Sequence, residues 1–297
     1  MKRALITGIE GFTGRHLAQA LACAGYAVSG LSHRPSGELS WPVHACDLLD
    51  RGALSGVVSL VRPDVVIHLA GIAFVAHSDP AAIYQTNVVG TRNLLDALAA
   101  SGSQASAVLL ASSANVYGNA QVQPLVEEQA LAPANDYAVS KLAMEYVAKL
   151  WGDKLPITIV RPFNYTGIGQ PLNFLLPKIV KHFADRAPVL ELGNLDVIRD
   201  FSDVRNVVDV YSRLLGADVA GQTFNVCSGT GYSLRDILAI MRDLTGHWPE
   251  ITTNPSFVRG SEVHKLIGSP ARLQRAVGPI SWIHIRETLA WMLEASN

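Results

Sequence analysis

One stretch near the start of the chain limits the folds that the sequence can adopt. Residues 4–7 form a short apolar run that reads as a strand, and a helical pattern begins soon after it and ends at Gly25. Between them lies a glycine-rich turn that contains Gly8, Gly11, Phe12 and Gly14. Such glycines permit a tight turn and bring backbone N–H groups close to a pyrophosphate, whose charge the helix N-terminus stabilises. The order strand, glycine turn and helix therefore predicts a dinucleotide-binding site.

Apolar strands alternate with helical patterns through the first half of the chain. We expect these strands at residues 27–31, 43–48, 65–69, 108–112 and 157–160. The alternation predicts an α/β fold with a Rossmann-type, doubly wound parallel sheet, which binds ligands at the carboxyl ends of its strands. Residues 81–100 predict one long helix. At the strand ends and on this helix, the residues expected to bind the cofactor are Asp47, Leu48, Leu69, Ala70, Gly71 and Asn87.

The end of the second strand predicts which dinucleotide is bound. NAD enzymes of this fold place an acid there for the ribose 2′-hydroxyl. Here Ser32, His33 and Arg34 occupy the position, so we expect no carboxylate there to repel a 2′-phosphate, and Arg34 can pair with one. The segment favours NADP(H) over NAD.

Composition excludes several classes of protein. The formal net charge of −1 and the lack of a basic block argue against nucleic-acid binding. The longest apolar run, residues 65–76, contains His68 and is too short to span a bilayer, which predicts a cytoplasmic protein without a membrane anchor. The three cysteines lack metal-ligand spacing, so no metal site is expected. His68 itself reads as a core histidine with its hydrogen bonds satisfied.

After residue 162 the pattern loosens. We expect an NADP-binding domain over residues 1–162, joined by residues 201–228, and a smaller mixed α/β substrate domain within 163–297, mainly 163–200 and 229–297. The second part carries scattered polar residues, and arginines there suit a diphosphate because a guanidinium group bonds phosphate oxygens bidentately. The candidates for substrate binding are Asn164, Asn173, Lys178, Arg199, Arg259 and Glu262.

Tyr137 and Lys141 are four residues apart in a predicted helix and therefore share one face. A nearby ammonium group favours phenolate, so the pair predicts a tyrosine with a lowered pKa that exchanges protons with a sugar hydroxyl or ketone. Alone, this spacing is weak evidence, because it more often marks a solvated helix face.

Six motifs in order resemble the extended short-chain dehydrogenase/reductase family that acts on nucleotide sugars. They are Thr7-Gly8-x-x-Gly11-Phe12-x-Gly14, His68-Leu69-Ala70-Gly71, residues 112–118, Tyr137-x-x-x-Lys141, Arg161-Pro162-Phe163-Asn164 and Arg199-Asp200-Phe201. The resemblance covers nearly the whole chain. It implies that Tyr137 is the catalytic acid/base, that Lys141 lowers its pKa and bonds the nicotinamide ribose, and that Ser113 bonds the reacting oxygen.

The same resemblance implies roles beyond the catalytic residues. Asn164, Arg199 and Arg259 match positions that contact the nucleotide diphosphate, Glu262 matches an acid near the ribose or phosphate end, and Asn115 is expected at the substrate. It also implies a homodimer, which helices at residues 81–100 and 137–151 have enough apolar surface to form.

The two residues after Ser113 narrow the expected reaction. Dehydratases of the family place an acid directly after this residue, whereas Ala114 and Asn115 cannot act as general acid or base. A reductase or an epimerase remains, and the NADP preference argues against an epimerase that retains NAD. Residues 193–201 and 259–270 resemble the branch that acts on GDP-linked 4-keto-6-deoxyhexoses, with UDP- and dTDP-sugar reductases and a UDP-glucose-type 4-epimerase as alternatives. A non-enzymatic dinucleotide sensor is disfavoured because both Tyr137 and Lys141 are present.

Overall fold

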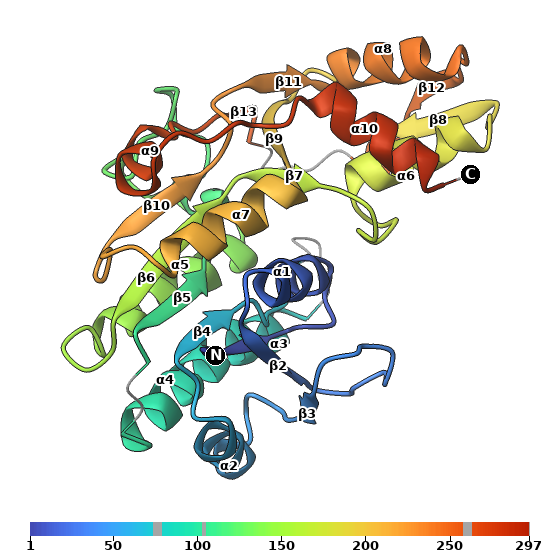
Figure 1. Cartoon of the computed structure of the whole chain (residues 1–297). Coiled ribbons are helices and arrows are strands. Elements are labelled where there is room, and N and C mark those ends of the chain that lie inside the picture. Colours follow the sequence, from blue (N-terminus) through green and yellow to red (C-terminus); the bar gives the residue numbers. More distant parts are fainter. Residues whose placement is uncertain (74–78, 103–104, 258–262, 297) are drawn as a thin grey trace.

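A seven-stranded parallel sheet forms the centre of the protein in the computed structural model, which describes residues 1–73, 79–102, 105–257 and 263–296 (Figure 1). In spatial order its strands are β10 (Thr223–Val226), β6 (Ile157–Pro162), β5 (Ala107–Ala111), β4 (Val65–His68), β1 (Arg3–Thr7), β2 (Ala27–Ser32) and β3 (Val43–Ala45). The central strands are mostly apolar because both faces of the sheet are covered. This order confirms the expected doubly wound fold and places a ligand crevice where it reverses, between β1 and β4.

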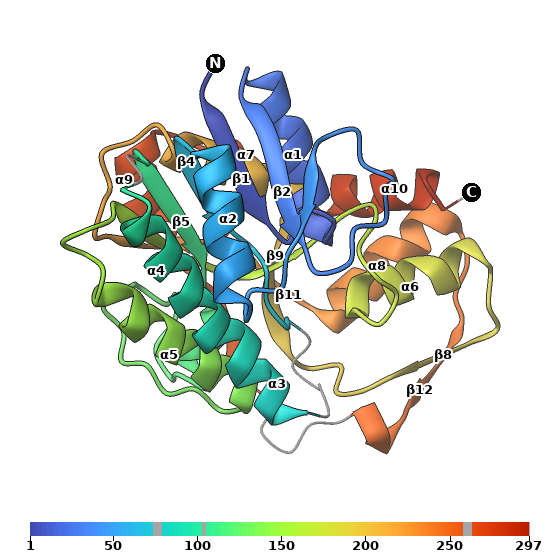
Figure 2. The same cartoon turned by 90° about the horizontal axis from the view of Figure 1, so that it is seen from below.

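Helices cover both faces of this sheet (Figures 1 and 2). On one face the core includes side chains of α1 (Phe12–Cys23), α7 (Val204–Leu214) and α9 (Ala271–Val277). On the other face it includes side chains of α2 (Arg51–Val61), α4 (Thr91–Ala100) and α5 (Asp136–Lys149). No helix in the described ranges combines the length and the apolar character that crossing a bilayer requires.

The prediction of one continuous helix over residues 81–100 is wrong for the middle of that segment. The structure divides it into α3 (Pro80–Tyr84), a π-helical segment η1 (Gln85–Gly90) and α4. The wider turn lets the side chain of Asn87 bond backbone groups outside the helix, while Gly90 packs so closely on Leu48 that a Cβ would lie 2.9 Å from the Leu48 Cβ. Such π segments occur frequently at functional sites.

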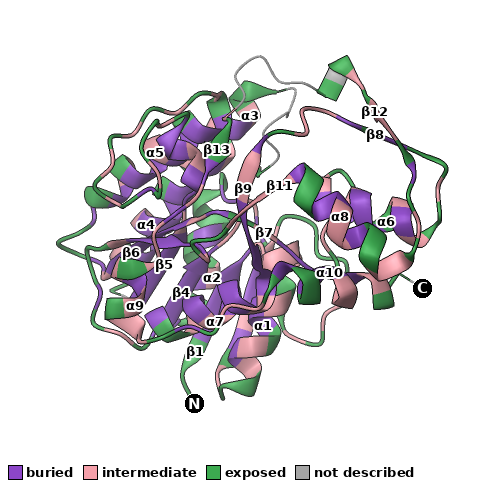
Figure 3. Ribbon diagram, turned by 90° about the horizontal axis from the view of Figure 1, so that it is seen from above, coloured by how far each residue is buried: buried purple, intermediate pink, exposed green. Residues whose placement is uncertain are grey.

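A second, smaller region packs around a mixed sheet (Figure 3). Its strands are β7 (Asn164–Thr166), β9 (Ile198–Asp203), β11 (Gly231–Ser233) and β13 (Lys265–Leu266), with β8 (Val189–Leu192) and β12 (Glu250–Thr253) paired beside them. Its helices are α6 (Leu175–Ala184), α8 (Leu234–Thr245), α10 (Ile285–Glu294) and the short η3 (Pro255–Phe257). Helices α6, α8 and α10 share an apolar core with β8 and β9.

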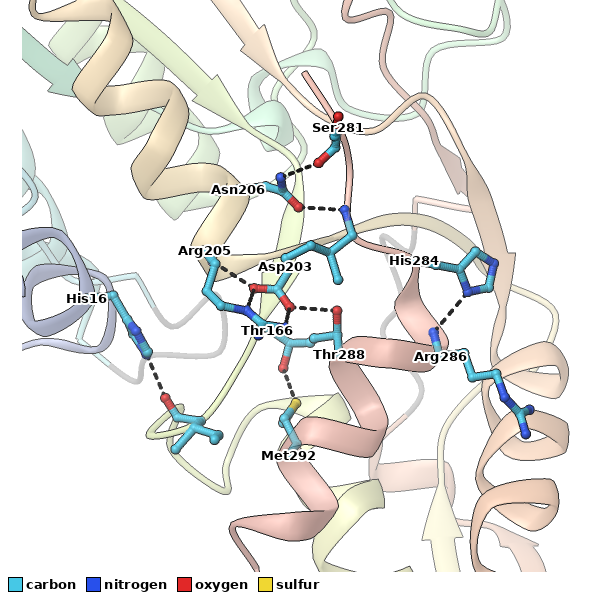
Figure 4. Close-up of polar contacts among 12 residues, drawn as sticks. His16, Thr166, Asp203, Arg205, Asn206, Ser281, His284, Arg286, Thr288 and Met292 are labelled. Atoms are coloured by element: carbon cyan, nitrogen blue, oxygen red, sulfur yellow. Dashed lines mark hydrogen bonds and ion pairs between the residues drawn. The ribbon is translucent and has the colours of Figure 1, made fainter. Parts of the chain in front are cut away.

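The two regions are interleaved along the chain. Strand β10 joins the large sheet beside β6, and Leu273 and Ile280 also lie in the core of that sheet. The joint is polar around Asp203, which is 1% exposed and accepts hydrogen bonds from the Arg205 side chain (2.9 and 2.7 Å) and from the Thr288 hydroxyl on α10 (2.8 Å; Figure 4). The Asp203 carboxylate also accepts a hydrogen bond from the Arg205 backbone N–H and so caps the N-terminus of α7. This buried carboxylate therefore ties α7 of one region to α10 of the other.

Candidate active site

The glycine turn after β1 is as tight as the sequence predicts. Gly8 adopts a positive φ of 70°, and a Cβ there would lie 2.9 Å from the backbone nitrogen of Ala70. A Cβ at Gly14 would lie 2.3 Å from the Gly8 carbonyl oxygen. Helix α1 begins at Phe12, and its N-cap residue Gly11 makes no side-chain cap bond, so the N–H groups of the first turn lack a capping acceptor from that residue. These residues fit a dinucleotide pyrophosphate, which would take up those N–H groups.

A buried hydrogen-bond chain fixes the segment after β4. The Thr91 hydroxyl donates to the Asn87 carbonyl (2.7 Å) and therefore accepts from His68 Nε2 (2.8 Å). Nδ1 of His68 is then the acceptor for the Thr7 hydroxyl (2.7 Å), whose oxygen accepts from the Ala70 N–H (3.1 Å). Burial lowers the pKa of His68 to about 3, so the ring is neutral. His68 is the satisfied core histidine that the sequence predicts.

Two residues expected at the cofactor, Asn87 and Gly71, make contacts that hold this segment in place. The Asn87 side chain is 1% exposed; it accepts from the Ile72 N–H (2.8 Å) and donates to the Ile72 carbonyl (3.1 Å) and to Ser140 on α5 (3.0 Å). The bare Cα of Gly71 makes room for protein groups, since a Cβ would lie 2.8 Å from Asn87 Oδ1 and 3.4 Å from Lys141 Nζ. Asn87 thus joins the loop after β4 to the helix that carries Tyr137 and Lys141.

The structure brings Ser113, Tyr137 and Lys141 together. Ser113 follows β5 and caps the short helix η2 (Ala114–Tyr117) by accepting from the Asn115 N–H (3.2 Å). Tyr137 and Lys141 lie on α5, and all three residues are at least 93% buried. Lys141 Nζ donates to the carbonyl of Ala111 at the end of β5 (2.8 Å). A hydroxyl, a phenol and an ammonium group therefore gather at the carboxyl end of β5.

The expectation of a lowered tyrosine pKa is wrong for the groups that this chain supplies. Burial raises the pKa of Tyr137 to about 12, although hydrogen bonding with Ser113 acts in the opposite direction. Burial also lowers the pKa of Lys141 to about 8, while Glu145 raises it. At neutral pH the site holds a protonated phenol beside a charged ammonium group.

A buried ion pair lies one turn further along α5 than Lys141. The sequence analysis did not predict it. Glu145, one turn beyond Lys141 on α5, pairs with Arg161 on β6 through bonds of 2.6 and 2.9 Å. The side chains are 4% and 6% exposed. Glu145 also accepts from the Ser112 hydroxyl (2.5 Å), and Arg161 donates to the Tyr117 hydroxyl (2.9 Å). The pair thus ties α5 to β6, and the bond from Ser112 ties α5 to the segment that carries Ser113.

The edge of the crevice at β2 and β3 differs in part from the expectation. Strand β3 ends at Ala45, earlier than expected, because Asp47 turns the chain towards α2 by accepting from the Leu49 N–H (2.9 Å). The Asp47 carboxylate also lies 3.6 Å from His33. Leu48, expected at the cofactor, is buried in the core, and its carbonyl accepts from Asn93 (2.9 Å).

A carboxylate does reach the end of β2, contrary to the expectation from residues 32–34. Glu10 lies in the glycine turn, and its Oε1 accepts from the backbone N–H (2.7 Å) and the hydroxyl (2.6 Å) of Ser36. Hydrogen bonds from Ser32 and Ser36 hold the pKa of Glu10 below its usual range. Arg34 is exposed and has no hydrogen bond or ion pair within the described part of the chain.

Comparison with known proteins agrees with this geometry. Over residues 4–227 the chain matches the NAD dependent epimerase/dehydratase family. It belongs to that family. The expected family is therefore confirmed. The protein is an NAD(P)-dependent oxidoreductase, as the sequence predicts.

Two relatives have named activities. GDP-6-deoxy-D-mannose reductase from Pseudomonas aeruginosa is 38% identical over 303 residues, covering 98% of this chain and 96% of the relative. GDP-6-deoxy-D-talose 4-dehydrogenase from Aggregatibacter actinomycetemcomitans is 34% identical over 275 residues, covering 92% and 90%. Both relatives match this chain along most of their length.

Two solved structures are similar to the whole chain. A crystal structure from Burkholderia cenocepacia J2315, described as a presumed epimerase, is 50% identical with a TM-score of 0.93 and covers 99% of this chain and 98% of the other. The structure of RMD from Pseudomonas aeruginosa in complex with NADPH is 35% identical with a TM-score of 0.87, covering 100% and 99%.

In this member of the family, the expected substrate residues lie on several elements. Asn115 is half-buried in η2, Asn164 is exposed at the start of β7, and Asn173 is exposed just before α6. Lys178 on α6 donates to the Glu191 carbonyl (2.8 Å), and Arg199 on β9 donates to the carbonyls of Ile198 (3.0 Å) and His264 (3.3 Å). Arg259 and Glu262 lie outside the described residues.

Sequence reasoning missed a contact between the glycine turn and the second region. The hydroxyls of Thr13 on α1 and Tyr165 on β7 are 2.8 Å apart, and the Phe12 ring stacks on Tyr165 with centroids 5.9 Å apart. Leu69, Phe12 and Tyr165 are partly buried and pack against the apolar core that includes α1 and α7. The position of Tyr165, directly after Asn164 in the Arg161–Asn164 motif, was the available signal. Phe12 therefore contributes to the joint between the regions.

Proposed function

We propose that the protein is an NADPH-dependent reductase of a nucleotide-linked 4-keto-6-deoxyhexose, and specifically that it converts GDP-4-keto-6-deoxy-D-mannose to GDP-D-rhamnose. One observation carries the proposal: Ser113, Tyr137 and Lys141 converge, and Ala114 and Asn115 supply no acid or base for a dehydration. The two relatives of named activity, both acting on GDP-linked 6-deoxy sugars, support the choice of substrate. The NADPH-bound neighbour supports the choice of cofactor.

The site residues divide the reaction between them. When bound, NADPH supplies the hydride that C4 of the sugar accepts. The Ser113 hydroxyl donates a hydrogen bond to the ketone oxygen, and Tyr137 transfers its phenolic proton to that oxygen, so the ketone becomes a hydroxyl and the phenol becomes phenolate. Burial keeps Tyr137 protonated before the step because it raises its pKa to about 12. The Lys141 ammonium group then stabilises the phenolate.

The second region is proposed to bind the nucleotide sugar, with residues 163–200 and 229–297 contributing most of the contacts. Asn164, Asn173, Lys178 and Arg199 are the described candidates, together with Asn115 in η2. Lys178 and Arg199 supply positive charge for a diphosphate.

The decisive assay measures NADPH oxidation with 4-keto-6-deoxy sugars linked to GDP, UDP or dTDP. The proposal expects turnover of the GDP-linked substrate and stoichiometric consumption of NADPH. Interconversion of UDP-galactose and UDP-glucose without net NADPH consumption would instead identify a 4-epimerase and refute the proposal.

Replacement of the catalytic phenol tests its role. Tyr137→Phe should lower kcat about 10²–10⁴-fold, because it removes the proton donor, and should leave nucleotide-sugar binding nearly unchanged. Tyr146→Phe is the control, since Tyr146 lies on the same helix but is 60% exposed. Near-normal turnover by Tyr137→Phe would exclude Tyr137 as the acid.

We also propose a homodimer formed through α5. Val139, Tyr146 and Leu150 are 38%, 60% and 74% exposed, and their spacing of seven and four residues puts them on one side of the helix. Burying this face between two copies would remove apolar surface from water. Sedimentation equilibrium of the protein and of a Leu150→Glu variant measures the association, and a monomeric wild-type protein would refute it.

A further inference from the structure

The carboxylate of Glu10 occupies the hydrogen-bond donors at the end of β2. Its Oε1 accepts from the Ser36 N–H (2.7 Å) and the Ser36 hydroxyl (2.6 Å), and Ser32 at the end of the strand also bonds the carboxylate. In a doubly wound dinucleotide fold, the groups at this strand end contact the ribose 2′ substituent of the cofactor. The donors expected to hold a 2′-phosphate are therefore already bonded to an anion of the protein.

Two of the nearby basic side chains, those of Arg15 and His33, lie beside carboxylates of the protein and are less available to neutralise a phosphate. The Arg15 guanidinium donates to the Glu10 carbonyl (3.0 Å) and pairs with Glu38 (3.0 Å). His33 lies 3.6 Å from the Asp47 carboxylate. Arg34 is the cation at this edge that has no ion pair among the described residues. A 2′-phosphate would meet one uncommitted arginine and several carboxylates.

We propose that Glu10 is a specificity-determining residue that weakens binding of NADP(H) relative to NAD(H) and so permits the enzyme to use both. With a 2′-phosphate present, the carboxylate must leave Ser32 and Ser36, and two anions then share one edge of the crevice. With a ribose 2′-hydroxyl, the same carboxylate accepts a hydrogen bond and keeps its place. Arg34 supplies the attraction that retains the phosphate. The inference rests on the proposed function only in taking the carboxyl ends of β1 and β2, beside the crevice, as part of the cofactor site.

Binding measurements test this role without the sugar substrate. Isothermal titration with NADPH and NADH, and with 2′,5′-ADP and 5′-AMP as probes of the adenosine half, gives the ratio of affinities for each pair. Glu10→Gln removes the charge and keeps the shape, and Glu10→Ser frees the donors. Both variants should shift the ratio towards the 2′-phosphorylated ligand by at least about tenfold, as expected when a repelled phosphate gains charge-assisted hydrogen bonds. Asp185→Asn, which removes an equal charge from an exposed ion pair on the second region, should leave the ratio unchanged.

Three outcomes would overturn the inference. A shift below twofold in both Glu10 variants excludes the role of Glu10, and so does equal tightening of 2′,5′-ADP and 5′-AMP, which would indicate a general charge effect. In these two cases NADPH turnover of the 4-keto sugar by the wild-type enzyme shows that the proposed function still holds. Binding of neither NADPH nor NADH by the wild-type protein would overturn both proposals together.

Discussion

The buried pair of Glu145 and Arg161 allows a quantitative prediction. Glu145→Gln leaves the Arg161 guanidinium, 6% exposed, without the carboxylate that accepts two of its hydrogen bonds at 2.6 and 2.9 Å. Removing one partner of such a pair costs about 3–5 kcal/mol, because the remaining charge stays desolvated. The variant should therefore lose about 3–5 kcal/mol of the free energy of unfolding measured with urea.

Two comparisons isolate the cause. Asp243→Asn breaks the exposed pair with Arg242, whose side chains are 54% and 51% exposed, and should cost less than about 1 kcal/mol. The double variant Glu145→Met/Arg161→Met removes both charges and should recover to within about 2 kcal/mol of the wild-type protein. A Glu145→Gln variant within about 1 kcal/mol of wild type would refute the reasoning.

The same substitution has a second readout in the pH profile. Burial lowers the pKa of Lys141 to about 8, even though Glu145 acts to raise it. Without the carboxylate the pKa of Lys141 should fall further, so the ammonium group loses its proton at lower pH. The alkaline limb of the kcat profile should move to lower pH in Glu145→Gln, whereas a purely structural loss would lower kcat evenly.

Two further predictions concern the glycine turn and the histidine beneath it. Gly8→Ala should cost at least about 2 kcal/mol in urea unfolding and weaken cofactor binding, because its Cβ would lie 2.9 Å from the Ala70 nitrogen at a φ of 70°. Gly25→Ala, also at positive φ but with nothing within 4 Å, is the control, and an equal cost would exclude the steric cause. The pKa of His68 lies near 6.5 unfolded and at about 3 folded, so the unfolded state binds more protons between these values and stability is lost as the pH falls through this window. Between pH 6.5 and 5 the wild-type protein should lose about 2 kcal/mol more than His68→Gln, and matching pH dependence would contradict a neutral buried ring.

Local sequence rules predicted the elements that local chemistry determines. The run before Gly8, the turn itself and the helix after it form as expected, because glycine conformation and apolar periodicity act within a few residues. The convergence of Ser113 with Tyr137 and Lys141 was also predictable, since parallel strands share one edge for their carboxyl ends.

The rest depended on contacts between residues far apart in the chain. The partner of Glu10 is Ser36, and the partner of Glu145 is Arg161, and neither pairing has a sequence signature. The π-helical turn at Asn87 adds one residue to a helical period, and the bonds of its side chain go to Ile72 and Ser140, residues that the local sequence does not indicate. The lowered pKa expected for Tyr137 failed for a similar reason: spacing predicts the ammonium group but not the degree of burial.

The interleaving of the two regions has a consequence for how the chain is made. Strand β10 spans Thr223–Val226, and Leu273 and Ile280 complete the core against which α1 packs. A ribosome releases the chain from its N-terminus, and domains generally fold as they emerge. Here the large sheet lacks an edge strand until Thr223–Val226 have been made, and part of one covering layer until Ile280 has been made. The glycine turn and α1 are thus made more than 200 residues before Leu273 and Ile280, and part of the apolar surface of α1 stays uncovered during that interval.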